Sequence, residues 1–191
     1  HTGEEQYFYL AQEFIDGQDL EQELATKGKF SEAEVTEILI EILKILEFVH
    51  ANNTIHRDIK PSNIMRNKQG VLYLLDFGAV KQIAVGGGNP KKSTGIFSMG
   101  FAPPEQMSGA QVYPSTDIYA LAVTCLNLLT DKEVEELYDS FNHTWQWHSF
   151  VPNISDRLKQ ILDRMLLPTP AHRFQSASVA LAALTVISKQ I

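Results

Sequence analysis

The stretch Ile55-His56-Arg57-Asp58-Ile59-Lys60-Pro61-Ser62-Asn63 decides how this 191-residue sequence is interpreted, and Asp76-Phe77-Gly78 follows it along the chain. Asp58 can accept the proton of a hydroxyl group, and Lys60, two positions later, supplies a flexible point charge. Asn63 and Asp76 provide hard oxygen ligands of the kind that Mg²⁺ prefers. A proton acceptor, a cation and two metal ligands are therefore concentrated in one short region.

This combination of groups suits phosphoryl transfer from a nucleotide. Such a transfer needs metal-binding oxygens, a group that orients the attacking hydroxyl and positive charge beside the moving phosphoryl group. Asp58 can orient the hydroxyl, and Lys60 can reach the γ-phosphate. Asn63 and Asp76 must converge for metal binding, and we expect a β-hairpin to bring them together.

The segments on both sides of this region have clear secondary-structure patterns. Ser31 and Glu34 have the spacing of a capping box at the start of a long helix, which is expected to end near Asn52-Asn53. Apolar residues recur along it every three or four positions, which predicts one buried face. These positions are Val35, Ile38, Leu39, Ile42, Ile45, Leu46 and Val49. Two apolar runs, 64–65 and 71–75, flank a polar turn and predict the hairpin.

The remaining segments predict a mostly α fold with a small β-hairpin. A strand at 7–10 is expected to be followed by a turn at Asp16-Gly17 and a short helix at 19–25. Glycines and prolines in 84–116 indicate a long loop. Helices are expected at 117–129, 155–167 and 176–188. A further helix is expected to start at a capping box formed by Thr130 and Glu133 and to end near Tyr138. We see no repeat and no linker, so one domain is expected.

Composition narrows the choice of function. Hydrophobic residues make up 44% of the sequence, charged residues 20%, and the net charge is −7. That charge argues against a protein that binds nucleic acid or anionic membranes by bulk electrostatics. No apolar run is long enough to span a bilayer, and no signal peptide is evident. The single cysteine, Cys125, lies in an apolar run, which favours a buried thiol and a cytoplasmic location.

The first stretch resembles the catalytic loop H-R-D-x-K-P-x-N of protein kinases, and Asp76-Phe77-Gly78 resembles their D-F-G motif. Six fixed positions in a chain of this length are expected by chance on the order of 10⁻⁵ times or fewer. The resemblance implies ATP and Mg²⁺, or Mn²⁺, as cofactors, with Asp58, Lys60, Asn63 and Asp76 as catalytic residues. Lys60 indicates protein serine or threonine substrates, and residues 145–173 resemble bacterial, particularly cyanobacterial, signalling kinases.

The resemblance also assigns the nucleotide-facing residues. It makes residues 1–19 the last small-lobe strand and the hinge, with the backbone of Glu13 and Ile15 facing adenine and Asp19 reaching the ribose. It makes 55–80 the catalytic loop and metal-binding hairpin, with Met65 under the adenine ring. A strand end, a helix cap and a core methionine are the alternative interpretations of these four residues.

Residues 76–105 correspond to the activation segment. Phe101-Ala102-Pro103-Pro104-Glu105 resembles the A-P-E motif, and Arg173 matches the arginine that pairs with its glutamate. Ser98 corresponds to the hydroxyl residue beside the substrate site, although Phe97 replaces the usual glycine before it. The resemblance makes Arg57 the receiver of an activation-loop phosphate, with Ser93 and Thr94 as candidate phosphosites. The resemblance also gives structural or regulatory roles to His56, Phe77, Gly78 and Asp117. Asp117 matches the aspartate that holds the catalytic-loop backbone, and it can also cap a helix that starts at Ile118.

Several parts of a complete kinase are absent from these residues. The sequence has no Gly-x-Gly-x-x-Gly loop, no Val-Ala-x-Lys strand and no helix with its glutamate partner. Because the first residue is His1 and not Met, we expect the chain to be an excised piece, the large C-terminal lobe of a kinase. Because the parts that hold the phosphates are missing, we expect this lobe to be inactive alone. Its uncovered surface around Phe8, Leu10, Phe14, Met65 and Phe77 is expected to favour self-association.

Two other functions remain open. A pseudokinase or scaffold would bind partners without catalysis, although it has no need for Asp58, Lys60, Asn63 and Asp76 together. A small-molecule kinase of the aminoglycoside type shares the aspartate and asparagine but generally lacks the lysine and the Pro-Pro-Glu segment. His143 and His148, which flank two tryptophans, lack partners at ligand spacing and are expected to pack among aromatics instead of binding metal.

Overall fold

The computed structural model describes residues 13–77, 81–82, 98 and 100–185. The strand expected at 7–10 and residues 186–188 of the last expected helix lie outside these ranges. The helices are α1 (Leu20–Lys27), α2 (Glu32–Ala51), α3 (Pro104–Met107), α4 (Pro114–Thr130), α5 (Val134–Leu137), α6 (Asp156–Met165) and α7 (Ala177–Thr185). Single 3₁₀ turns are η1 (Pro61–Asn63), η3 (His148–Phe150) and η4 (Pro170–His172). The content is mostly helical, as expected.

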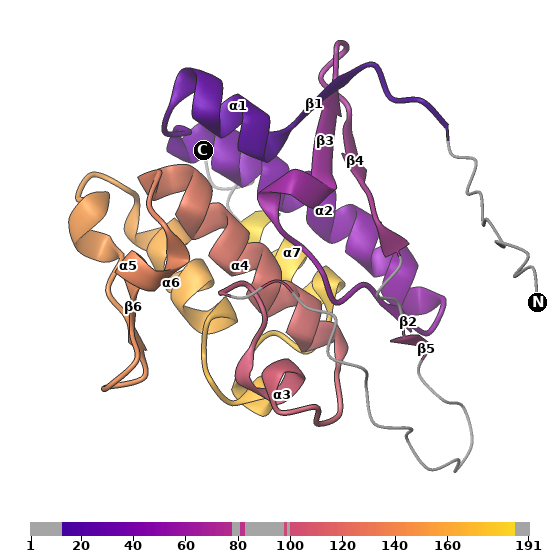
Figure 1. Cartoon of the computed structure of the whole chain (residues 1–191). Helices are drawn as coiled ribbons and strands as arrows, with labels where there is room; N and C mark the ends of the chain where they lie inside the picture. Colours follow the sequence, from indigo (N-terminus) through magenta and orange to yellow (C-terminus); the bar gives the residue numbers. More distant parts are fainter. Residues whose placement is uncertain (1–12, 78–80, 83–97, 99, 186–191) are drawn as a thin grey trace, which may run out of the picture.

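The strands are short and form small antiparallel sheets. They are β1 (Gly17–Asp19), β2 (Thr54–Ile55), β3 (Ile64–Asn67), β4 (Leu72–Leu74), β5 (Lys81–Gln82), β6 (Tyr138–Asp139) and β7 (Thr144–Trp145). Their pairings give one sheet in the order β1-β3-β4 and two separate pairs, β2-β5 and β6-β7. The three-stranded sheet stands at one end of the helical body, next to α1 and α2 (Figure 1).

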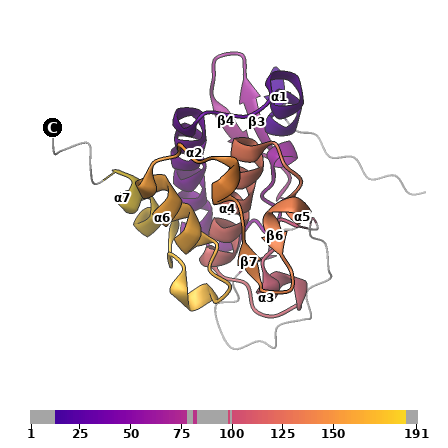
Figure 2. The same cartoon turned by 90° about the vertical axis from the view of Figure 1, so that its left-hand side faces the viewer.

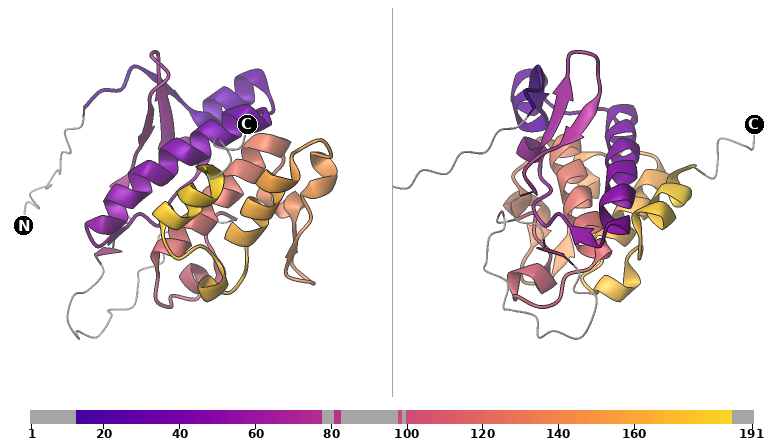
Figure 3. Two further views of the ribbon diagram at one scale, coloured as in Figure 1. Left: turned by 180° about the vertical axis from the view of Figure 1, so that it is seen from behind. Right: turned by 90° about the vertical axis from the view of Figure 1, so that its right-hand side faces the viewer.

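The long helix α2 forms as its sequence predicts. Ser31 accepts a hydrogen bond from the backbone of Glu34, and the Glu34 carboxylate accepts one from the backbone of Ser31, so the capping box is present. The apolar face is buried except for Ile45, which is partly buried, and Leu43 joins it. Seen from behind, α2 crosses the molecule with α7 and α4 packed beside it (Figure 3).

Helix α4 is the centre of the core, and α2, α6 and α7 pack against it (Figure 2). Nearly every residue of α4 is buried, including Cys125, where burial raises the thiol pKa to about 12. The predicted start at Asp117 is wrong, because the helix begins at Pro114. Proline suits this position since its missing N–H needs no partner there. The expected N-cap role of Asp117 is therefore also wrong; the Thr116 hydroxyl instead accepts from the Tyr113 backbone N–H at 3.0 Å.

The predicted hairpin is present as β3 and β4, which pair Ile64 with Leu74 and Arg66 with Leu72. The sheet has a third strand that the sequence did not predict, because β1 occupies the place of the expected turn at Asp16-Gly17. The backbones approach so closely that a Cβ on Gly17 would lie 2.0 Å from the carbonyl oxygen of Arg66. Glycine is therefore required for this pairing.

The segment after α4 differs from its prediction. Thr130 is the last residue of α4 and its hydroxyl bonds the carbonyl of Leu126, so it does not cap the next helix. The α5 helix is one turn long and is followed by the β6-β7 pair. Trp145 of β7 packs its ring against Tyr138 and Tyr119. In the described part of the chain, no helix has the length and apolar character needed to cross a membrane.

Candidate active site

Residues 56–60 are irregular backbone between β2 and η1, and a buried carboxylate of α4 holds them in place. Asp117 Oδ2 accepts from the backbone N–H of His56 at 2.9 Å, and Oδ1 accepts from that of Arg57 at 2.8 Å. His56 is buried; its Nδ1 accepts from the Asp58 N–H, so Nε2 donates to the carbonyl of Leu75 at 2.8 Å. These contacts tie the loop both to the core helix and to the end of the hairpin.

Asp58 is surrounded by the polar side chains that the sequence singled out. Asn63 Nδ2 donates to Asp58 Oδ2 at 2.9 Å, and the hydroxyl of Ser98 donates to Oδ1 at 2.8 Å. Lys60 Nζ donates to the same Ser98 hydroxyl at 2.8 Å and lies 3.6 Å from Asp58 Oδ2. The structure thus brings Asp58, Lys60, Asn63 and Ser98 together. A hydroxyl oxygen beside Asp58 and Lys60 meets both an acceptor and a positive charge.

The hairpin also brings the two expected metal ligands towards each other. The backbone N–H of Leu75 donates to the carbonyl of Asn63 at 2.8 Å, and Asp76 is the next residue. Asp76 has a φ of +63°, a conformation that aspartate tolerates better than most residues. Its side chain is exposed and has no hydrogen bond or ion pair to any other described residue.

These two side chains fit a magnesium ion. The Asn63 amide nitrogen is engaged by Asp58, which leaves its oxygen as the atom for a cation, and Asp76 adds an exposed carboxylate. Mg²⁺ is commonly held by one or two protein oxygens together with water and substrate phosphates. No cluster of three or more His, Cys, Asp and Glu residues suited to a metal occurs in the described ranges.

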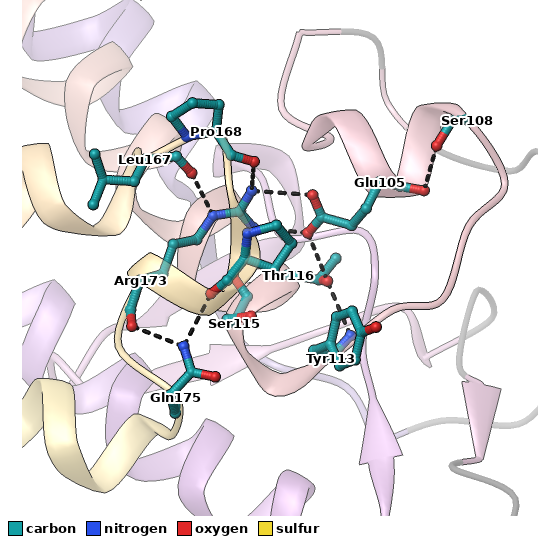
Figure 4. Close-up of polar contacts among 10 residues, drawn as sticks. Glu105, Ser108, Tyr113, Ser115, Thr116, Leu167, Pro168, Arg173 and Gln175 are labelled. Carbon is teal, nitrogen blue, oxygen red and sulfur yellow. Dashed lines mark hydrogen bonds and ion pairs between the residues drawn. The ribbon is translucent and has the colours of Figure 1, made fainter.

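Glu105 and Arg173 form a buried ion pair that anchors the segment after Ser98 (Figure 4). Two guanidinium nitrogens of Arg173 donate to the Glu105 carboxylate, at 2.7 and 3.0 Å. The Thr116 hydroxyl donates to the same carboxylate, and Arg173 also donates to the carbonyls of Leu167 and Pro168. The pair joins α3, the start of α4 and the chain after α6.

Gln106 is a contact residue that sequence reasoning missed. Its side chain is buried, and Nε2 donates to the backbone carbonyl of Arg57 at 2.7 Å. Together with Asp117, it holds the Arg57 peptide on both sides. No local signal in the sequence could have identified it, because a glutamine in a short helix after Pro103-Pro104 is ordinary and its partner is far away in the chain.

The residues assigned to the nucleotide lie in β1, in β3 and in the irregular segment that precedes β1. Asp19 and Met65 are directly opposite each other in the β1-β3 pairing. Asp19 caps α1 through a hydrogen bond from the Gln22 backbone, and Met65 is half-buried. Glu13 is exposed and Ile15 half-buried. The helix-cap interpretation of Asp19 is therefore correct, and a contact with ribose remains a prediction.

Arg57 and Phe77 are two residues to which the sequence assigns a regulatory or structural role around the activation segment, and both lie in the described ranges. Arg57 is 9% exposed and has a φ of +73°. Burial lowers the pKa of its guanidinium, and the Asp117 carboxylate opposes that change. Phe77 packs the edge of its ring against His56 and is 44% exposed. Gly78, Ser93 and Thr94 lie outside the described residues.

A cavity of about 310 Å³ lies beside the segment that follows Ser98. Gly100 and Ala102 line it, and the other lining residues come from α3, α4, α5 and the β6-β7 region. Most of them are apolar, and Tyr119 and Trp145 contribute aromatic rings. Glu135 adds an acidic residue to the lining. The cavity is therefore suited to an apolar side chain with positive charge nearby.

Comparison with known proteins relates this chain to protein kinases in each case. The family described as "Protein kinase domain" matches residues 2–183. Serine/threonine-protein kinase F of Synechocystis sp. is 59% identical over 95% of this chain and 37% of its own length. Serine/threonine-protein kinase PknA of Nostoc sp. is 41% identical over 93% of this chain and 32% of its own length. The chain thus spans about a third of the length of these relatives.

Proposed function

The chain belongs to the protein kinase domain family, and from this premise we propose that it transfers the γ-phosphoryl group of ATP to serine or threonine hydroxyls of proteins. The observation that carries the proposal is the arrangement around Asp58, with Lys60, Asn63 and Ser98 in direct polar contact. The names of its cyanobacterial relatives, serine/threonine-protein kinases, support the choice of acceptor.

Each side chain has a defined task in this proposal. Asp58 accepts a hydrogen bond from the acceptor hydroxyl, as it does from Ser98, and receives its proton during transfer. Lys60 stabilises negative charge on the moving phosphoryl group. Asn63 orients Asp58 with its nitrogen and offers its oxygen, with Asp76, to Mg²⁺. The bound Mg²⁺ neutralises charge on the phosphates.

The apolar cavity supports a polypeptide acceptor. Gly100 in its wall is two residues from Ser98, so their Cα atoms are at most about 7 Å apart. We propose that a substrate chain with its hydroxyl at Asp58 places a neighbouring apolar side chain there. Glu135 favours a basic residue close to that side chain. A small sugar acceptor has no use for such a cavity.

Nucleotide binding and regulation complete the proposal. The backbone of Glu13 and Ile15 faces the adenine, Asp19 the ribose, and Met65 the adenine ring. Phosphorylation of Ser93 or Thr94 gives Arg57 an anion to bind. A cytoplasmic location is part of the same proposal, because ATP is abundant there.

We further propose that residues 1–191 act as a large lobe with little activity by themselves. They contain no glycine-rich loop and no Val-Ala-x-Lys lysine to hold the phosphates. Phe14 and Phe77, which are 86% and 44% exposed, support an apolar surface that a small lobe or a second copy covers. Light scattering over a range of concentrations tests self-association, and a monomer at the highest concentration would contradict it.

The testing experiment compares acceptors. The full-length protein is incubated with labelled Mg²⁺-ATP and either a generic protein substrate or a panel of aminoglycosides. We expect label on protein, recovered as phosphoserine or phosphothreonine. Label on sugars alone would favour a small-molecule kinase, and no label on either would favour a scaffold. Running residues 1–191 in parallel tests the inactivity of the lobe.

A further inference from the structure

A buried polar contact connects the end of α2 to the proposed catalytic loop. His50 lies in the last turn of α2, and its Nε2 is 2.8 Å from Oδ2 of Asp117. Because a carboxylate can only accept hydrogen bonds, Nε2 is the donor. The side chains of His50 and Asp117 are 7% and 0% exposed, so water does not compete for this bond.

Three N–H groups therefore donate to one buried carboxylate. Oδ2 receives Nε2–H of His50 and the backbone N–H of His56, and Oδ1 receives the backbone N–H of Arg57. A buried carboxylate is costly unless donors replace the lost water. Removal of the His50 donor leaves Oδ2 short of a partner, and the carboxylate must shift or recruit water. The two backbone amides that the Asp117 carboxylate holds belong to His56 and Arg57, the two residues before Asp58.

The backbone at Arg57 depends on such fixation. Its φ of +73° is unusual for a residue with a large side chain, and such conformations persist only where the surroundings impose them. Gln106 fixes the carbonyl side of Arg57, and Asp117 fixes the amide side. A change at Asp117 is thereby transmitted to the position of Asp58.

A histidine at this place is not explained by packing alone. His50 Nδ1 is buried and has no hydrogen-bond partner among the described residues. An unsatisfied buried polar atom costs stability, so an apolar side chain of similar shape would serve the core better. The retained donor at Nε2 is the feature that an apolar residue cannot supply.

We propose that His50 is a positioning residue for Asp58, acting through Asp117 and the His56-Arg57 backbone. The inference rests on the proposed function, because that function assigns the proton-accepting role to Asp58. It concerns the geometry of the catalytic loop and not nucleotide binding, so its kinetic effect belongs in kcat. His50→Leu removes the donor, whereas His50→Gln keeps an N–H at a similar distance from the backbone.

The test uses the full-length protein with His50→Leu, His50→Gln and, as a control, His148→Leu, which removes a surface contact to Asp163. We expect His50→Leu to lower kcat by about 10- to 100-fold, since small misplacements of catalytic groups have such effects. The KM for ATP should stay within about twofold. His50→Gln should recover most of kcat, and His148→Leu should match the wild type.

Amide hydrogen exchange gives a readout that does not depend on activity. Faster exchange confined to His56 and Arg57 in His50→Leu is expected, with slow exchange restored in His50→Gln. If the wild type lacks kinase activity but exchange changes in this way, the positioning role stands and the proposed function fails. Unchanged exchange at both amides, or equal loss of kcat in the two His50 variants, would overturn the positioning role.

Discussion

Asn63 holds Asp58 twice through a single amide nitrogen: Nδ2 lies 2.9 Å from the carboxylate oxygen Oδ2 and 2.7 Å from the backbone carbonyl oxygen of Asp58. The asparagine side chain therefore sets the orientation of the proposed proton acceptor. Its remaining polar atom, the amide oxygen, is the one that a cation can use. In the proposed function, one residue thus couples metal binding to the position of Asp58.

Asn63→Ala should disturb both of these tasks. We expect kcat for phosphate transfer to fall by about 10- to 100-fold, as is typical when a group that supports a metal site is removed. The activity should also require a higher Mg²⁺ concentration. Steady-state kinetics over a Mg²⁺ titration measures both effects. Asn142→Ala, in an exposed turn, is the control, and equal Mg²⁺ requirements in both variants would argue against a metal role for Asn63.

The buried pair of Glu105 and Arg173 should contribute strongly to folding. Arg173→Met leaves the Glu105 carboxylate buried with the Thr116 hydroxyl as its remaining side-chain donor, and we expect a loss of about 3–5 kcal/mol in unfolding free energy. Urea denaturation measures it. Lys44→Met, which breaks the exposed pair with Glu41, should cost no more than about 1 kcal/mol. Similar losses in the two variants would show that burial does not matter here.

Gly17 should be irreplaceable in the β1-β3 pairing. A methyl group there would lie 2.0 Å from the Arg66 carbonyl oxygen, so Gly17→Ala must displace the strand. We expect a loss of about 1–3 kcal/mol, the usual cost of overpacking. Thermal or urea unfolding tests this, with the exposed neighbour Gln18→Ala as control. Wild-type stability in Gly17→Ala would mean that β1 does not pair as described.

The capping box of α2 should make stability depend on pH. Hydrogen bonds from Lys27 and then Ser31 lower the pKa of Glu34 from 4.5 to about 2. Since the folded-state pKa is below the unfolded one, the stabilisation is fully present above pH 4.5 and is lost as the pH falls towards 2. Because Glu34 is partly exposed, we expect Glu34→Gln to cost only about 1 kcal/mol at pH 7.

Urea unfolding at several pH values between 7 and 3 checks this sign. The stability difference between wild type and Glu34→Gln should shrink as the solution becomes more acidic. Glu37→Gln is the matched control, since Glu37 is exposed on the same helix. A difference that grows with acidity would contradict the assigned direction.

The parts of the fold that were predicted from sequence are those with local signals. The capping box at Ser31, the apolar period of α2 and the hairpin turn before Val71 each lie within a few residues of the structure that they specify. The motif residues Asp58, Lys60 and Asn63 were recognised as a set, and they lie together. Local patterns were sufficient for these features.

The missed parts depend on distant partners or on competing local signals. Strand β1 has no alternating pattern, and its pairing with β3 spans a long stretch of chain. The start of α4 was misplaced because Asp117 looks like an N-cap, whereas its carboxylate accepts from the backbone N–H groups of His56 and Arg57. The Gln106 contact with Arg57 could not be predicted for the same reason. Tertiary contacts override local preference at these places.

The most direct test of the central claim is phosphate transfer by the full-length protein carrying Asp58→Asn. At saturating Mg²⁺-ATP we predict a fall of about 10²- to 10⁴-fold in the rate of transfer, since a positioned general base contributes that much. ATP affinity should be nearly unchanged, and Asp156→Asn, a substitution of the same kind at an aspartate whose side chain is 90% exposed, should keep wild-type activity. A rate for Asp58→Asn equal to the wild type would contradict the assignment of Asp58 and the mechanism built on it.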